Sequence, residues 1–198
     1  VLGDYYTEPV LLIKTSWGGR NLHVDFRPPS AVAARGGAVG PYYTGMIDYV
    51  RDVLGNLGSE FPEWAGMGYQ IAGFGWHQGW NDRVDATASA AYEDNLVDLI
   101  NDLRAEFGRP DLPISIGTTG MVPPGTAQSP VEAAQLAVAD PVQHPAFAGT
   151  VFTVDTRPFW RDASVSPSSF GYHWNHNGES QYLNGSAMGD GMVDLLTP

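Results

Sequence analysis

The stretch that most constrains the fold is Tyr69 to Asp82, which reads YQIAGFGWHQGWND. Residues 69–76 are mostly apolar, and they lead into a polar corner at residues 77–82. An apolar run of this length between turn residues is typical of a strand covered on both faces. Ligand sites in open α/β sheets lie beyond the carboxyl ends of such strands. The sequence therefore predicts a functional site at this corner; a turn that only caps the next helix is the alternative.

The rest of the chain alternates between predicted strands and helices. Further strands are predicted at residues 8–15, 112–117 and 150–155. Helical patterns occupy residues 41–57, 87–107, 130–138 and 181–196, and residues 20–41 read as a long surface excursion beside the site. This alternation favours an α/β fold with four mostly parallel strands. Since no linker or repeat is evident, we expect one domain over residues 1–198.

Composition excludes several classes of partner and chemistry. With 22 acidic and 10 basic residues, the net charge is −12, which argues against nucleic acid and anionic membranes as partners. No apolar segment reaches the length of a membrane span. The chain has no cysteine, so disulfides and thiolate chemistry are excluded. Because the first residue is Val1, we expect a mature, processed or fragmentary chain.

Side chains suited to acyl transfer follow the predicted strands. Asn81 can donate an amide N–H to a developing oxyanion, and Gln78 lies beside it. Gly18 and Gly19 follow the first predicted strand and can present backbone N–H groups. His173, on a late loop, can act as a general base. Parallel strands bring their carboxyl ends to one edge, so we expect these residues to converge around one site.

These motifs resemble the SGNH, or GDSL-like, hydrolases, in particular the sialate O-acetylesterase and acetylxylan esterase branch (carbohydrate esterase family six). The phrases similar to that branch are VLLIKTSWGGR at 10–20, IAGFGWHQGWND at 71–82, VDTRPFW at 154–160 and HWNHNGES at 173–180. The resemblance implies a flavodoxin-like three-layer sandwich with a mostly parallel sheet. It also implies hydrolysis of acetyl esters on carbohydrates, or of small esters, without a metal or cofactor. A secreted or periplasmic location is typical of such proteins.

The resemblance also assigns roles to individual residues. Gly18 or Gly19 is similar to the family's oxyanion-hole glycine, and Asn81 to its oxyanion-hole asparagine, with Gln78 alongside. His173 is similar to the family's catalytic base. The candidate substrate contacts beside these residues are Trp80, Asp82, Trp174 and His176.

The chain departs from the family at the nucleophile. The family's serine stands in a Gly-x-Ser motif after a first, central strand, whereas the similar motif here, Gly3-Asp4-Tyr5, ends in tyrosine. We therefore expect this chain to correspond to the portion after that strand, with a companion polypeptide supplying the missing first strand and the serine. Ser16, at the end of the segment at 8–15, is an alternative nucleophile. A catalytically inactive fragment, or a carbohydrate-binding remnant, is a further alternative.

The acid partner of His173 is also open. Phe170 stands where the family usually places an aspartate, so Asp162 or Glu179 would orient the imidazole, or the site is a dyad. A metal-dependent hydrolase is the rival from another class. His173, His176 and Glu179 are spaced at three and three, which on a helix would place them on one face as metal ligands. Metal-bound water would then replace the serine, although Asn177-Gly178 argues against a regular helix there.

Overall fold

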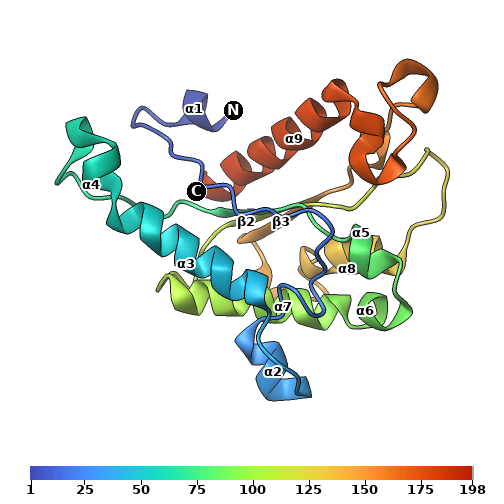
Figure 1. Cartoon of the computed structure of the whole chain (residues 1–198), viewed down its shortest axis with the longest axis horizontal. Coiled ribbons are helices and arrows are strands. Elements are labelled where there is room, and N and C mark those ends of the chain that lie inside the picture. The colour runs from blue at the N-terminus through green and yellow to red at the C-terminus, as the bar shows by residue number, and fades with distance from the viewer. Residues whose placement is uncertain (198) are drawn as a thin grey trace.

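A parallel three-stranded sheet between two layers of helices forms the centre of the protein (Figure 1). The structure is a computed structural model, and it describes residues 1–197. The strands are β1 (Phe74–Trp76), β2 (Ile114–Gly117) and β3 (Val151–Val154), in the order β1-β2-β3. Both pairings are parallel, with Phe74 opposite Ile114 and Ile114 opposite Val151. The predicted α/β class with a parallel sheet is confirmed.

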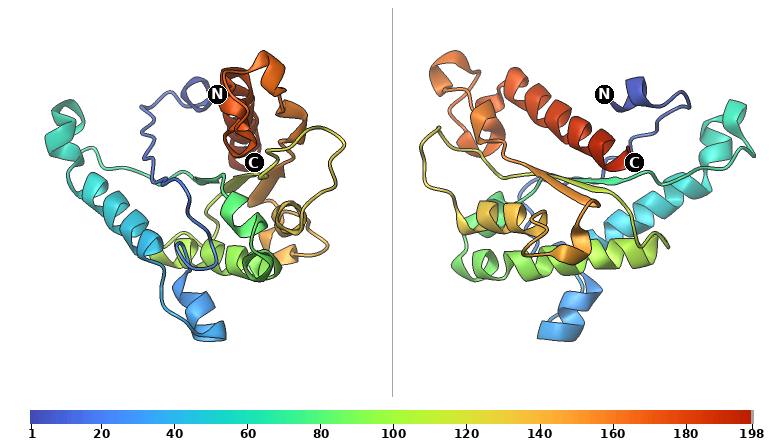
Figure 2. Two further views of the ribbon diagram at one scale, coloured as in Figure 1. Left: turned by 45° about the vertical axis from the view of Figure 1, so that its right-hand side comes forward. Right: turned by 180° about the vertical axis from the view of Figure 1, so that it is seen from behind.

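Helices cover both faces of this sheet. The longer helices are α3 (Pro41–Gly55), α7 (Tyr92–Glu106), α8 (Pro130–Val138) and α9 (Gly178–Leu196). The shorter helices are α1 (Leu2–Tyr5), α2 (Pro29–Arg35), α4 (Leu57–Glu60), α5 (Trp80–Arg83) and α6 (Ala86–Ala90). Helix α9 lies on one side of the sheet, while α3, α7 and α8 lie on the other (Figure 1), and Figure 2 shows the same arrangement from two further directions. No helix within residues 1–197 combines the length and apolarity needed to span a bilayer.

Within residues 1–197, five 3₁₀ segments lie between the helices and strands, and the longest of them has six residues. Their bounds are η1 (Pro62–Trp64), η2 (Pro145–Phe147), η3 (Arg157–Phe159), η4 (Ala163–Val165) and η5 (Gly171–His176). Turns η3 to η5 lie between β3 and α9, so the long connection at the carboxyl end of the sheet is built from short turns rather than from a regular helix.

The main core lies between the sheet and the layer of α3, α7 and α8. Alternate strand residues point into it, because successive side chains of a strand face opposite sides of the sheet. The strands contribute Trp76, Ile114, Ile116 and Val151, and α7 contributes Leu96, Leu99 and Leu103, all of them buried. Each buried side chain of this size stabilises the fold by about 1.5–3 kcal/mol relative to its exposed state. The apolar stripe predicted at 87–107 thus corresponds to the buried face of α7.

The opposite face of the sheet is lined by glycine, which allows α9 to approach closely. A methyl group built at Gly73 would overlap Met192 of α9, and one built at Gly117 would lie 2.9 Å from Met188. In the same interface Gly191 of α9 leaves room for the ring of Phe152. The Ser115 hydroxyl donates to the Met188 carbonyl at 2.7 Å. Helix α9 is thus held against the sheet by backbone contact as well as by side-chain packing.

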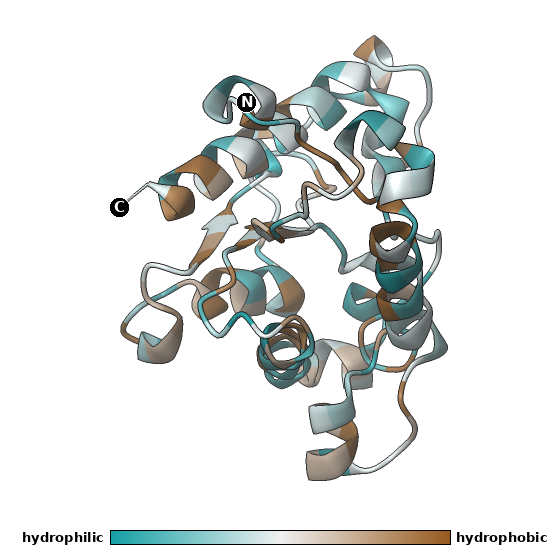
Figure 3. Ribbon diagram, turned by 90° about the vertical axis from the view of Figure 1, so that its left-hand side faces the viewer, coloured by the Kyte–Doolittle hydropathy of each residue, from teal (hydrophilic) through white to brown (hydrophobic). Residues whose placement is uncertain are grey.

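The predicted strand at residues 8–15 is wrong, and the sheet has three strands rather than four within residues 1–197. This segment is extended but forms no ladder with a neighbour, and its apolar side chains are exposed: Val10 38%, Leu11 45% and Leu12 76%. Figure 3 shows this hydrophobic coil running away from α1. An extended segment becomes a strand only when another strand satisfies its backbone groups.

Three other boundaries differ from the prediction. The helix predicted at 87–107 is divided at Ala91 into α6 and α7, and Asp85 caps α6 by accepting from the Ala88 N–H at 2.8 Å. The strand predicted at 69–76 is regular only over Phe74–Trp76. The excursion at 20–41 is not wholly on the surface, because it contains α2 and buries Leu22 and Phe26.

Replacing Gly191 by alanine tests the close approach of α9. The new methyl group would overlap the Phe152 ring, and overpacking of this kind lowers the free energy of unfolding by about 1–3 kcal/mol. The matched control is Gly185→Ala, because Gly185 lies on an exposed part of the same helix with no atom near the new methyl group. That change should raise stability by about 0.5–1 kcal/mol. Denaturant unfolding measures both, and equal effects of the two variants would contradict the proposed packing.

Candidate active site

The corner after β1 is held rigid by hydrogen bonds to its backbone. Gln78 carbonyl accepts from the Tyr92 hydroxyl at 2.8 Å and from Gln135 Nε2 at 2.6 Å. The Tyr92 hydroxyl also accepts from Trp76 Nε1 at 3.1 Å. Gly79 has a φ of 154°, and a methyl group there would overlap the Thr119 hydroxyl. Only glycine fits this turn, so Gly79 fixes where α5 begins.

Asn81 meets the segment that precedes α2 at Gly19. Its Nδ2 donates to the Gly19 carbonyl at 2.7 Å, although 62 residues separate the two positions. Gly19 is in the left-handed region with a φ of 71°, which glycine adopts without strain. Gln78 Nε2 donates to the carbonyl of the next residue, Arg20, at 2.9 Å. The structure therefore brings Gly19, Gln78 and Asn81 together after β1.

The Asp82 carboxylate holds the segment that follows Gly19 against α5. Its oxygens accept from the backbone N–H of Leu22 at 2.8 Å, from that of His23 at 3.0 Å, and from Gln78 Nε2 at 2.7 Å. Burial raises the pKa of Asp82, and these hydrogen bonds oppose that shift. Asp82 is 0% exposed, so it positions the 18–23 segment and does not face a substrate, contrary to the contact suggested from the sequence.

The loop that carries His173 lies beside the same corner. The Tyr172 ring is 5.9 Å from the Trp80 ring, and the Trp174 ring is 6.3 Å from the imidazole of His77, at the end of β1. His173 is exposed, and its imidazole is 5.2 Å from that of His176. Tyr172 and Trp174, on either side of His173, therefore contact the corner after β1. Within residues 1–197 no hydrogen bond joins the His173 imidazole to Asn81 or Ser16.

Trp174 is a core residue of this loop. It is 1% exposed and lies between His77 and Trp160, whose ring is 6.4 Å away. The predicted substrate contact of Trp174 is therefore replaced by a packing role. Three consecutive residues, Trp174, Asn175 and His176, have φ angles of 54°, 52° and 56°. Each such residue costs about 1–3 kcal/mol unless surrounding contacts hold it, and the buried indole supplies such contacts.

His77 has the most altered environment among the histidines of the site. Its Nδ1 lies 3.2 Å from the Gly117 carbonyl, and its Nε2 is buried without a partner among the described residues. Burial lowers the pKa of His77, and the contact with Gly117 opposes that shift. Because the Gly117 carbonyl oxygen can only accept, Nδ1 carries a proton in this contact. Apart from the position of His77 at a strand end, the sequence gives no sign that its imidazole is buried.

Neither alternative acid partner is bonded to His173. Asp162 accepts from the Trp160 indole N–H at 2.9 Å, and Glu179 pairs with Arg161 through two hydrogen bonds of 2.9 and 2.8 Å. The ligand geometry that the metal hypothesis requires is also absent from the described residues. The loop at 173–176 is not a regular helix, and within residues 1–197 no three His, Asp or Glu side chains are grouped closely enough to hold a metal ion.

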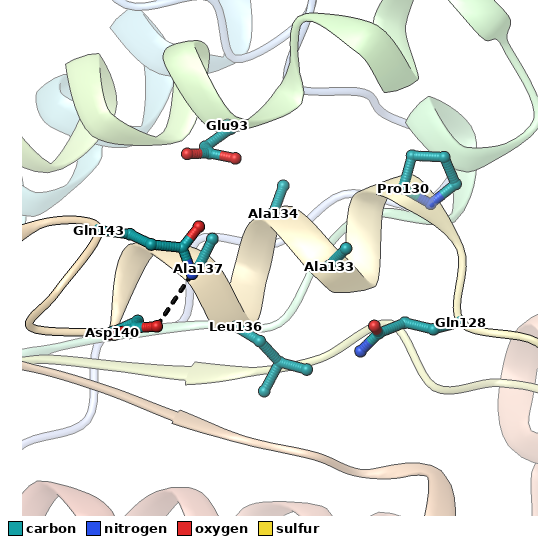
Figure 4. A pocket seen from close by; sticks show the side chains of 9 residues that line it. All are labelled: Glu93, Gln128, Pro130, Ala133, Ala134, Leu136, Ala137, Asp140 and Gln143. Atoms are coloured by element: carbon teal, nitrogen blue, oxygen red, sulfur yellow. Dashed lines mark hydrogen bonds between the residues drawn. The ribbon is translucent and has the colours of Figure 1, made fainter.

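Other parts of the surface add nothing to this site. Ser16 is exposed on the extended segment directly before Trp17, whose ring packs 5.3 Å from that of Tyr42. Figure 4 shows a separate hollow on α8, into which small side chains such as Ala133 and Ala137 project. None of the residues that line this hollow is a candidate site residue.

Asp82→Asn tests the anchor. An asparagine keeps one acceptor oxygen for Leu22 and His23, but its NH2 group would then face the donors that Oδ2 now accepts from, the Leu22 N–H and Gln78 Nε2. We expect the free energy of unfolding to fall by about 2–4 kcal/mol, since buried N–H groups lose a charged acceptor. The control is Asp85→Asn, because asparagine caps a helix as well as aspartate does. A loss no larger than that of the control would contradict the anchoring role.

The known proteins similar to this chain include one family and one solved structure. Among curated proteins none matches the sequence significantly. The X-ray structure of a protein from Arabidopsis thaliana is similar, with 19% sequence identity and a TM-score of 0.45, over 73% of this chain and 52% of that one. The chain thus spans about half the length of that solved protein. A family described as "Carbohydrate esterase, sialic acid-specific acetylesterase" matches residues 3–164. Because this match covers well over half of the sequence, the chain belongs to that family of carbohydrate esterases.

Proposed function

We propose that the protein is a serine-type hydrolase of O-acyl esters, acting on acetyl groups carried by carbohydrates. The contact between Asn81 and Gly19 carries the proposal, because it joins the two segments that resemble an oxyanion hole. Membership of the carbohydrate esterase family supports the same reaction class. The contact lies at the carboxyl end of β1, where ligands bind in open α/β sheets.

In the proposed reaction a serine oxygen attacks the ester carbonyl carbon, and the carbonyl oxygen becomes negatively charged. The second N–H of the Asn81 amide and the backbone N–H groups at Gly18 and Gly19 stabilise this charge. His173 takes the serine proton and gives it to the sugar oxygen as the carbon–oxygen bond breaks. Water then attacks the acyl-enzyme, again with proton transfer through His173, and acetate leaves.

The serine comes from a companion polypeptide in this proposal. Within residues 1–197, β1 pairs only with β2, so its other edge has unpaired backbone groups. A strand added at this edge would satisfy the backbone groups. It would also end at the same edge of the sheet as Asn81.

A carbohydrate-binding protein without catalytic activity is the second candidate function. The exposed rings around His173 favour it, since Tyr172 and Phe170 are 42% and 49% exposed beside the site. Aromatic side chains present both an apolar face and large contact area to a ligand. This candidate predicts saturable binding of an oligosaccharide without any turnover.

Asn81→Ala tests the oxyanion hole. Removing one such donor lowers kcat by about 10²–10³-fold in acyl-transfer enzymes. In the complex with the companion polypeptide that supplies the serine, we expect a loss of this size for p-nitrophenyl acetate, with little change in KM, because the amide acts on charge that develops in the transition state. His173→Ala should lower kcat by about 10²–10⁴-fold, as expected for a general base.

The control for Asn81 is Asn101→Ala, which removes an exposed asparagine from α7. This variant should hydrolyse the ester at the rate of the unchanged protein. Equal activity in Asn81→Ala and Asn101→Ala would exclude the proposed oxyanion hole. Complete absence of hydrolysis in the natural preparation, together with oligosaccharide binding, would favour the binding candidate instead.

The source of the nucleophile is tested by covalent labelling. A fluorophosphonate probe reacts with activated serines, and mass spectrometry then identifies the labelled peptide. In protein purified from its natural source we expect the label on a serine of a second polypeptide, and none on Ser16. Label on Ser16 would show that the nucleophile lies in this chain. Ser16→Ala serves as the matched control, because it removes only that hydroxyl.

A further inference from the structure

A short buried segment after β2 lies between the corner that carries Asn81 and the loop that carries His173. It comprises residues 118–120, reads Thr-Thr-Gly, and all three residues are buried. We refer to it as the 118–120 segment. Because β2 is the middle strand of the sheet, this segment can contact the chain that follows β1 as well as the chain that follows β3.

The 118–120 segment contacts the corner through Thr119. A methyl group built at Gly79 would overlap the Thr119 hydroxyl and would lie 3.1 Å from Gln135 Nε2, so these three residues are packed against one another. Gly79 stands directly before α5, two residues ahead of Asn81. Thr119 and Gln135 are both fully buried. The start of α5 is therefore fixed against Thr119.

The same segment contacts the His173 loop through Gly120. Gly120 has a φ of 46°, and a methyl group there would overlap the Thr156 hydroxyl and lie 3.1 Å from the Trp174 ring. Thr156 is bonded to the segment twice, since its N–H donates to Thr118 Oγ1 at 3.0 Å and its hydroxyl donates to the Thr118 carbonyl at 2.8 Å. Trp174 directly follows His173. The buried indole of the loop is therefore packed against the 118–120 segment.

The Gln135 side chain of α8 joins this segment to the corner by hydrogen bonds. Its Oε1 accepts from the Thr119 N–H at 2.9 Å, while its Nε2 donates to the Gln78 carbonyl at 2.6 Å and to the Tyr92 hydroxyl at 3.1 Å. One buried amide thus serves as acceptor for the segment after β2 and as donor to the corner after β1. Buried polar networks of this kind hold backbone segments rigidly when their members are paired.

We propose that Gln135 and the 118–120 segment position the oxyanion donor and the catalytic base of the proposed site relative to each other. This inference rests on the proposed function for the roles of Asn81 and His173, whereas the physical link between corner and loop is independent of that function. The donor and the base act on the same reacting ester, so a displacement of one from the other lowers the rate. Gln135 is buried and therefore acts through its partners, not on the ester itself.

Hydrogen exchange of the folded chain, measured by NMR, tests the link without any substrate. Two amides report on the two sides: Arg83 N–H donates to the Gly79 carbonyl at 2.8 Å, and Asn175 N–H donates to the Phe170 carbonyl at 3.0 Å. Gln135→Met keeps the length of the side chain and removes its donor and acceptor. We expect both amides to exchange about tenfold faster or more, which corresponds to about 1.4 kcal/mol of local stability.

Two references separate this local effect from a general loss of stability. Amides of the core residues 96–103 in α7 should exchange within about twofold of their original rates, because they open only with the whole fold. Thr153→Val is the matched control, since it removes the 2.7 Å hydrogen bond to the Gln135 backbone carbonyl but leaves the Gln135 side chain in place. Faster exchange of Arg83 without faster exchange of Asn175, or equal effects of both variants, would overturn the proposal.

Thr119→Ala is a milder second variant. It keeps the backbone bond to Gln135 and removes only the side chain that packs against Gly79. The Arg83 amide should then exchange about threefold faster or more. Unchanged exchange at this amide would contradict the contact between the 118–120 segment and the corner.

Kinetics of the complex with the companion polypeptide test the effect on the reaction. Gln135→Met should lower kcat for p-nitrophenyl acetate about tenfold and leave KM within about twofold, because the displaced groups act in the transition state. Thr153→Val should change neither constant. An unchanged kcat in Gln135→Met would overturn the positioning role. Absence of ester hydrolysis in the unchanged complex would contradict the proposed function, and the exchange rates of Arg83 and Asn175 would still decide whether the 118–120 segment links the corner to the loop.

Discussion

The buried carboxylate of Asp82 is the interaction on which the candidate site depends. It is a charged group with 0% exposure, and its compensation comes from the backbone N–H groups of Leu22 and His23 and from the Gln78 amide. Burying an ion without such partners costs several kcal/mol. The chain therefore has to bring residues 22–23 against α5, and this fixes the preceding glycines beside Asn81. The Asp82 carboxylate thus makes the segment around residues 19–23 part of the site.

A second constraint acts from the other face of the sheet. Helix α9 lies close to the strands because glycines line that face, and its N-terminus fixes where the loop before it must end. Asn177 caps this helix by accepting from the Ser180 N–H at 3.1 Å. Three left-handed residues immediately before the cap turn the loop back toward β1. Their strain is offset by the burial of Trp174, so the loop position is determined by packing and not by local preference.

Local signals predicted part of this structure well. The helix at Pro130–Val138 has the predicted bounds, because Ser129 and Glu132 form a capping box at its start. Asn81 and Gly19 do meet, but not because parallel strands share one edge, since no strand forms within residues 1–18; the Asp82 carboxylate, which holds residues 22–23, brings them together. The strand at 8–15 failed because a strand needs a partner, and periodicity in one segment does not report whether a partner exists. The break at Ala91 has no glycine or proline to announce it.

The roles of single side chains were harder to infer than their positions. Asp82 and Trp174 lie in polar stretches typical of ligand contacts, yet both are buried. Tyr92 gave no signal within its helix, although its hydroxyl joins Trp76, Gln78 and Gln135. The backbone partners of Asp82 are 59 and 60 residues away, and the hydrogen-bond partners of Tyr92 are 14 to 43 residues away. Such pairings are decided by the packing of whole elements, which no short pattern encodes.

The open edge of β1 has a consequence for how copies of the protein behave together. Among residues 1–197 this strand is paired on one side only, and an unpaired row of backbone groups can accept a strand from another molecule. The charge of −12 on each copy opposes such an encounter. That repulsion weakens when salt shortens the Debye length to about 3 Å at 1 M, and it vanishes near the isoelectric point of 4.5. Self-association through this edge should therefore increase with added salt and near the isoelectric point.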